Sequence, residues 1–185
     1  MKVINMFGPP GAGKTTKALI LTGMLKEAQV DAEVSLEVVK EYIHAGTEKL
    51  LSYQNYIFAQ QERSLHFLLD SREAEFAVTD SPLLLPVLYA SKNYPAYFKD
   101  LVFETFNRYD NINFFVHRNH PYSYNSRIHN EKQSDLLSKK MHAFLVNNNI
   151  PFIDILSTDS TKDMVFDYVM KNRDLEYQKN KKIRT

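Results

Sequence analysis

The sequence contains no cysteine and no tryptophan, and only five of its 185 residues are glycine. Without cysteine, the chain has neither disulfides nor zinc sites built from thiolates, and a reducing cytoplasm is its natural compartment. No apolar run approaches the ~20 residues that span a bilayer, so no membrane segment is expected. The formal net charge is only +1, which argues against a protein that binds polyanions with its whole surface.

The residues that are present have the proportions of an ordinary globular protein, with 44% apolar and 24% charged. The length suits one domain with a sizeable core. We predict a single domain over residues 1–173 and a basic tail over 174–185. The tail is expected to be solvated and frayed, and contact with nucleic acid is the alternative.

Short apolar runs alternate with segments of helical periodicity. Strands are predicted at 2–7, 32–37, 75–80, 111–118 and 150–156. Helices are predicted at 14–28, 38–45, 49–73, 95–110, 131–148 and 161–172. This alternation favours an α/β fold with an open, mostly parallel sheet flanked by helices. Because the N-terminus runs straight into a strand, no signal peptide is expected.

The segment GPPGAGKT, residues 8–15, matches the pattern G-x-x-x-x-G-K-[ST] without a mismatch. It follows a predicted strand and opens a predicted helix, so we expect a three-layer P-loop NTPase fold. Glycines let backbone N–H groups turn toward phosphate oxygens, and the N-terminus of the helix favours the same anion. The predicted ATP-binding residues are Gly8, Gly11, Ala12, Gly13, Lys14, Thr15 and Thr16.

The chemistry of phosphoryl transfer assigns roles to three of the side chains near this loop. Lys14 is expected to reach the β- and γ-phosphates as a catalytic point charge. Thr15 and Asp80 are the predicted Mg²⁺ ligands, because Asp80 ends the third strand at the ligand-binding edge of the sheet. Asp80 is also the predicted general base. Ser81 follows it where many ATPase motors have a glutamate, which favours transfer to an acceptor over hydrolysis.

A polar segment after the fourth strand, residues 117–131, is predicted to be a lid, a loop that closes over the phosphates. It carries Arg118 and Arg127, which are predicted to stabilise the charge on the transferring phosphoryl group. Long loops within compact domains are usually functional. The alternative is a solvated surface loop with ordinary charges.

The acceptor is expected on the other side of the nucleotide. Glu37 follows the second strand, while Gln60 and Arg63 share a face of the third predicted helix and Gln54 lies nearby. Amide and guanidinium groups read base edges, so these four are the predicted substrate-binding residues. The alternative is a partly exposed helix face without a ligand. The six histidines show no metal-ligand spacing and are interpreted as surface or packing residues.

The motifs GPPGAGKTT and TDSPLLLP, with the arginine-bearing lid, resemble the P-loop kinases of the nucleoside and nucleotide kinase group. Over most of residues 1–157 the chain is similar to small phage-encoded proteins often labelled AAA-type ATPases. The more specific segments of this resemblance are LEVVKEY, YQNYIFAQQERSLH, TDSPLLL, YDNINFFVHR and PYSYNSR. The chain departs from that pattern where His117-Arg118 replaces a Lys-Arg pair at the entrance to the lid.

Members of this family are known as 5-hydroxymethyluracil DNA kinases, which phosphorylate the hydroxymethyl group of a modified base already inside phage DNA. Other relatives are labelled only as ATPases or nucleotide kinases. The resemblance therefore implies a Mg-ATP-dependent kinase with a nucleoside-type acceptor, in the cytoplasm of a host cell. Three alternatives for its action stay open at this point: DNA modification, phosphorylation of free nucleosides or monophosphates, and a nucleotide-dependent binding module.

Overall fold

A computed structural model gives the fold of the chain and describes residues 2–36, 46, 48–71, 74–123 and 129–183. Five strands form one sheet in the order β2-β3-β1-β4-β5. The strands are β1 (Lys2–Phe7), β2 (Ala32–Ser35), β3 (Phe76–Thr79), β4 (Asp110–His117) and β5 (Ile153–Leu156). All four neighbouring pairs are parallel, so the predicted α/β sheet is confirmed and every strand ends at the same edge.

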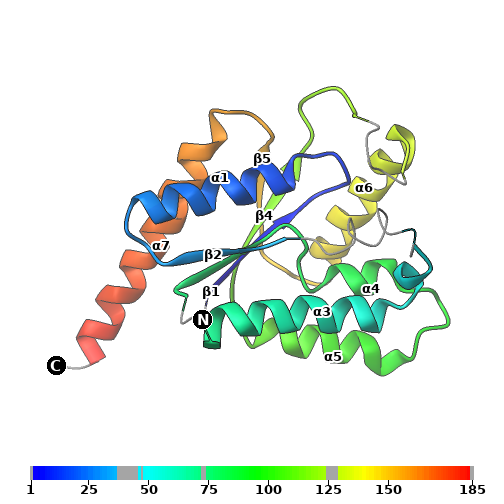
Figure 1. The fold of residues 1–185 in the computed structure, drawn as a ribbon, viewed down its shortest axis with the longest axis horizontal. Helices are drawn as coiled ribbons and strands as arrows, with labels where there is room; N and C mark the ends of the chain where they lie inside the picture. The colour runs from blue at the N-terminus through cyan, green and yellow to red at the C-terminus, as the bar shows by residue number, and fades with distance from the viewer. Residues whose placement is uncertain (1, 37–45, 47, 72–73, 124–128, 184–185) are drawn as a thin grey trace.

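Helices cover both faces of this sheet and complete a three-layer architecture (Figure 1). One face carries α1 (Lys14–Glu27) and α7 (Thr161–Ile183). The other carries α3 (Gln54–His66), α4 (Leu85–Tyr89), α5 (Ala96–Asn107) and α6 (Glu131–Asn147). The predicted helix at 38–45 lies outside the described residues.

Side chains that alternate along the central strands hold the layers together. Ile4 and Met6 of β1 pack in a buried cluster with apolar residues of α1 and α7. Val3 and Phe7, which point the other way, pack in a second cluster with residues of α3, α4, α5 and α6. Because strand side chains alternate between faces, one apolar run supplies both cores.

The same alternation in β4 places Phe114 and Val116 toward α1 and α7. Phe115 belongs to the cluster on the opposite face. His117 follows Phe115 at the strand period, and its ring lies 4.9 Å from the Phe115 ring. The end of β4 therefore presents a polar side chain on the face that α6 covers.

The single long helix predicted over 49–73 is wrong in detail, because the chain forms a 3-10 helix at Glu48–Ser52, then α3, then a π-helix at Phe67–Ser71. The Tyr94 hydroxyl lies at the first break. It donates to the Ser52 carbonyl and accepts from the Asn55 backbone N–H, both at 3.3 Å. A side chain from outside the segment thus satisfies backbone groups that a continuous helix would pair.

The last helix, α7, runs to Ile183 and so extends past the predicted end at residue 172. Figure 1 shows its C-terminal turns extending away from the sheet. Arg173 donates two hydrogen bonds to Glu75, at 2.6 and 3.0 Å, and joins the helix to the start of β3. In the part of the chain that the structure describes, no helix combines the length and apolar character needed to cross a membrane.

Candidate active site

The loop between β1 and α1 has the backbone conformation of a phosphate-binding loop. Gly8, Gly11 and Gly13 have φ angles of 140°, 82° and 86°, a region that residues with a Cβ rarely adopt. A Cβ on Gly8 would lie 2.6 Å from the Val116 carbonyl oxygen, and one on Gly13 would lie 2.5 Å from the Ser157 Oγ. Gly8 is therefore required by its close approach to the backbone of β4, and Gly13 by its positive φ.

The remaining predicted ATP-binding residues follow from the loop into α1. Ala12 is fully buried, and its backbone N–H donates to the Pro9 carbonyl at 3.2 Å. Lys14 opens the helix, and its Nζ donates to the same carbonyl at 3.2 Å. Thr16 is exposed at the start of α1. The Pro9 carbonyl therefore accepts hydrogen bonds from two residues that follow it in the loop.

Asp80 lies directly beyond β3 and is 1% exposed. The Thr15 hydroxyl donates a hydrogen bond to its Oδ2. The two residues are 65 positions apart in sequence, and the pairing of β1 with β3 brings them together. The predicted Mg²⁺ ligands therefore lie side by side, and a hydroxyl with a carboxylate is an oxygen set that suits Mg²⁺.

Gln61 is a buried residue of α3 that contacts this edge of the sheet, and it was not among the predicted site residues. Its Nε2 donates to the Ser81 Oγ at 2.6 Å, while its Oε1 is buried with no hydrogen-bond partner in the described part of the chain. Ser81 is held in turn, because its backbone N–H donates to the Thr79 Oγ1 at 3.0 Å. The available signal was a glutamine at an apolar position of a helix, in line with Ile57 and Leu65.

The predicted acceptor-side residues do not gather on one surface. Gln54 is buried, and its Nε2 donates to the Leu51 carbonyl at 2.6 Å, which fixes it to the turn before α3. Gln60 donates to the Tyr56 hydroxyl at 2.9 Å on the outer face, where Arg63 is also exposed. Glu37 lies outside the described residues. The structure therefore separates Gln54 from the Gln60 and Arg63 face.

Arg118, at the start of the predicted lid, forms ion pairs with two acids in the first turns of α6. Its Nη2 lies 2.6 Å from the Asp135 carboxylate and 3.1 Å from that of Glu131. Its guanidinium carbon lies 5.0 Å from the centre of the Tyr122 ring. The Nη1 is buried with no partner among the described residues. The other lid arginine, Arg127, lies outside the described residues.

Helix α6 also contacts the phosphate-binding loop, a relation that no local pattern in the sequence predicts. The fully buried Ser134 donates through its hydroxyl to the Pro10 carbonyl at 2.7 Å. The Gly8 backbone N–H donates to the Met141 sulfur at 3.3 Å. One helix therefore carries both the acids that hold Arg118 and two contacts to the loop.

Lys17, one turn into α1, is a buried cation near this site. Its Nζ donates to the Thr158 carbonyl. Burial lowers the pKa of Lys17, partly offset by the charge of Asp159, and nearby Lys162 lowers it further. Lys17 therefore joins α1 to the segment after β5, whereas the Lys14 side chain contacts the phosphate-binding loop.

The parallel sheet, the glycine loop and the buried carboxylate at the end of β3 define a P-loop nucleotide-binding fold. The profile of a family described as an AAA domain matches residues 3–162, and the chain belongs to that family. No protein with a curated description matches it. Among solved structures, thymidylate kinase from Ehrlichia chaffeensis is similar at a TM-score of 0.59 and 14% identity, over 91% of this chain and 98% of that one. The fold is therefore that of a nucleotide-kinase-like P-loop domain.

Proposed function

We propose that this chain is a Mg-ATP-dependent kinase with a nucleoside-type acceptor, and that the acceptor is the hydroxymethyl group of 5-hydroxymethyluracil in DNA. The observation that carries the proposal is the contact between Thr15 and the buried Asp80 beside the phosphate-binding loop. A P-loop supplies the donor site, and an acid at the neighbouring strand end supplies the group that a metal ion or an attacking hydroxyl requires.

In this mechanism the loop amides and Lys14 hold the phosphates of ATP, and Thr15 and Asp80 hold Mg²⁺. When bound, Mg²⁺ neutralises charge that develops on the phosphates. Asp80 orients the acceptor hydroxyl and takes its proton as the oxygen attacks the γ-phosphorus and ADP leaves.

Arginines of the lid act on the transferring phosphoryl group. Arg118 has a buried Nη1 without a partner among the described residues, and we assign this nitrogen to a phosphoryl oxygen. Arg127 is proposed to supply a second positive charge. Because α6 holds Arg118 through Asp135 and Glu131, the guanidinium is oriented before the nucleotide binds.

Glu37, Gln54, Gln60 and Arg63 are proposed on the acceptor side. Gln60 and Arg63 lie on the outer face of α3, from which they can contact a base. A base within duplex DNA is stacked, so the target has to be flipped out of the helix to reach Asp80.

The structural likeness to a thymidylate kinase favours a second candidate, a kinase of free nucleosides or nucleoside monophosphates. Thymine and 5-hydroxymethyluracil differ by one hydroxyl group on the 5-methyl carbon, so both candidates require a pocket for a 5-substituted uracil. They differ in whether that base arrives within a polymer, and in the accepting oxygen: the hydroxymethyl group of the base for the first candidate, a sugar hydroxyl or a phosphate oxygen for the second.

A transfer assay with labelled ATP tests the proposal and separates the candidates. Four acceptors are compared: hydroxymethylated DNA, unmodified DNA, free nucleosides and free monophosphates. We expect label only in the hydroxymethylated DNA. Label in a free nucleoside or monophosphate alone would replace the DNA acceptor with the second candidate. Release of phosphate at the same rate with every acceptor would indicate a nucleotide-dependent binding module instead of a kinase.

A further inference from the structure

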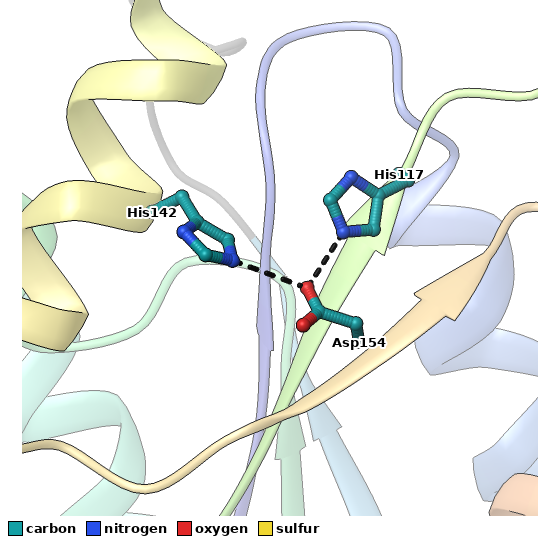
Figure 2. A group of neighbouring side chains, drawn as sticks. All are labelled: His117, His142 and Asp154. Atoms are coloured by element: carbon teal, nitrogen blue, oxygen red, sulfur yellow. Dashed lines mark hydrogen bonds and ion pairs between the residues drawn. The ribbon is translucent and has the colours of Figure 1, made fainter.

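Three side chains from three elements meet beside the end of β4: His117 of β4, His142 of α6 and Asp154 of β5 (Figure 2). The His117 Nε2 lies 2.6 Å from the Asp154 Oδ1, and the His142 Nε2 lies 3.5 Å from the same oxygen. The three ligand atoms all lie within 4.8 Å of one another. The sequence predicts surface or packing roles for these histidines because they show no metal-ligand spacing, and the fold brings two of them to one carboxylate from distant positions in the chain.

Aromatic rings fix the two imidazoles. The centroid of the Phe115 ring lies 4.9 Å from that of the His117 ring and 5.1 Å from that of the His142 ring. The Phe152 and His142 ring centroids are 4.9 Å apart. Outside this packing the three side chains remain open to solvent, with exposed fractions of 39%, 40% and 51%. The cluster is thus rigid on its inner side and accessible to an ion on its outer side.

We propose that His117, His142 and Asp154 bind one divalent transition-metal ion of the Zn²⁺ class, at a site separate from the Mg²⁺ of the nucleotide. Two imidazoles with one carboxylate suit zinc and its neighbours in the first transition row, whereas Mg²⁺ prefers oxygen ligands. Three protein ligands leave at least one coordination position for water. Among the described residues, this is the one group of three metal-ligating side chains that meets such distances.

The two distances to the Asp154 Oδ1 are close to those of an occupied site. Metal–ligand bonds of about 2.0–2.1 Å place tetrahedral ligands roughly 3.3 Å apart, and the His142–Asp154 separation is already 3.5 Å. The His117–Asp154 separation of 2.6 Å is that of a hydrogen bond and has to open by less than ~1 Å. When a metal binds at the His117 Nε2, that nitrogen carries no proton, and the neutral imidazole bears its one proton on Nδ1.

The neighbours of the ligands indicate what the ion would do. Arg118 follows His117 in the chain, and Met141, whose sulfur accepts from Gly8, precedes His142. An ion bound by residues of β4, β5 and α6 would therefore hold α6 against the sheet, and α6 contacts both the phosphate-binding loop and Arg118. Its expected effect is to stabilise the fold around the nucleotide site, with no part in the chemistry.

Titration of the nucleotide-free full-length chain with Co²⁺, followed by visible absorption, tests the site, with Zn²⁺ as competitor. We expect one Co²⁺ per chain, displaced by Zn²⁺ and retained in excess Mg²⁺. His142→Asn and Asp154→Asn should each weaken binding by at least about 10-fold, since loss of even an outer-shell partner typically costs 10- to 100-fold.

The matched control is His66→Asn. His66 also lies 2.6 Å from a carboxylate, that of Asp70, but outside the three-ligand cluster, so Co²⁺ binding should not change. Zn²⁺ should raise the melting temperature of the native chain and the control but not of the two ligand variants. Unchanged Co²⁺ affinity in His142→Asn and Asp154→Asn, or equal loss in His66→Asn, would overturn the proposal. Neither readout depends on kinase activity, so the result stands apart from the proposed function.

Discussion

At the scale of single residues, Thr15 and Asp80 are two predicted site residues that the structure brings into direct contact. A local pattern predicts each residue: the lysine-threonine pair of the loop predicts Thr15, and the acid at a strand end predicts Asp80. Their contact adds what neither pattern contains, a carboxylate that is 1% exposed and held against the phosphate-binding loop. A buried carboxylate in this position has a specific test.

Asp80→Asn should retain ATP binding but slow phosphoryl transfer by about 10²- to 10⁴-fold, the usual contribution of a general base. The amide preserves the shape of the side chain while removing its charge and its ability to take a proton. Labelled-phosphate transfer and nucleotide binding are measured on the same preparation. Asp100→Asn on the exposed surface of α5 is the control and should have no effect. Full transfer activity in Asp80→Asn would contradict the assignment of the base.

Two glycines of the same region provide a matched pair for stability. Gly13→Ala should lower the free energy of unfolding by about 1–3 kcal/mol, because φ is 86° and the new Cβ would meet the Ser157 Oγ at 2.5 Å. Gly23→Ala, within α1 and with nothing within 4 Å, should raise it by about 0.5–1 kcal/mol. Denaturant unfolding measures both. Similar effects of the two substitutions would show that the loop conformation is not constrained as described.

At the scale of elements, α6 connects the two halves of the site. Its first turn is closed by a capping box between Asn130 and Gln133, and the acids of its first turns bind Arg118. Further along, Ser134 and Met141 contact the phosphate-binding loop. The position of the lid arginine and the shape of the loop therefore depend on one helix.

Arg118→Lys should lower the free energy of unfolding by about 1–3 kcal/mol, because an ammonium group lacks the planar guanidinium that lies on Tyr122 while its Nη2 contacts Asp135 and Glu131. It should also reduce phosphoryl transfer. Arg108→Lys is the control, since Arg108 lies 3.6 Å from Glu104 in an exposed pair on α5. That substitution should change stability by less than about 0.5 kcal/mol. Thermal unfolding and transfer rates are compared for both variants, and equal effects would remove the special role of Arg118.

The boundaries of the elements show the limits of local patterns. The positions of the five strands follow from short runs rich in apolar residues. The central strands β1 and β3 are buried along their whole length, whereas the edge strands β2 and β5 are buried only in part. The break before α3 does not follow from a local pattern, since it depends on the hydroxyl of Tyr94 from a distant segment. The continuation of α7 past residue 172 is likewise joined to β3 by Arg173 and Glu75.

At the scale of the whole molecule, the net charge of the chain limits how much of its surface a DNA acceptor could contact. The formal net charge of +1 is small, and several of the positive charges lie in the last residues of the chain. A DNA substrate would contact only part of the surface. The response of activity to salt reports the number of phosphates contacted, because each contact releases a counterion.

Activity on hydroxymethylated DNA should fall steeply with salt at subsaturating substrate. Each contacted phosphate contributes a slope of about −0.9 on logarithmic axes, which is roughly a 3.5-fold loss per contact for a fourfold increase in salt. Hydrolysis of ATP in the absence of an acceptor serves as the control and should change little. A flat response together with full activity on free nucleotides would reject DNA as the acceptor.

The sequence by itself determined the P-loop, the α/β alternation and the candidate pair Thr15 and Asp80, because these depend on short patterns of residue type. The tertiary structure decided which of the candidate residues meet. It separated Gln54 from Gln60, and it placed Gln61 against Ser81. The physical reason is that strand order brings together residues that are far apart in the chain. The clearest case is the meeting of His117, His142 and Asp154, three residues whose spacing in sequence carries no metal-binding signal.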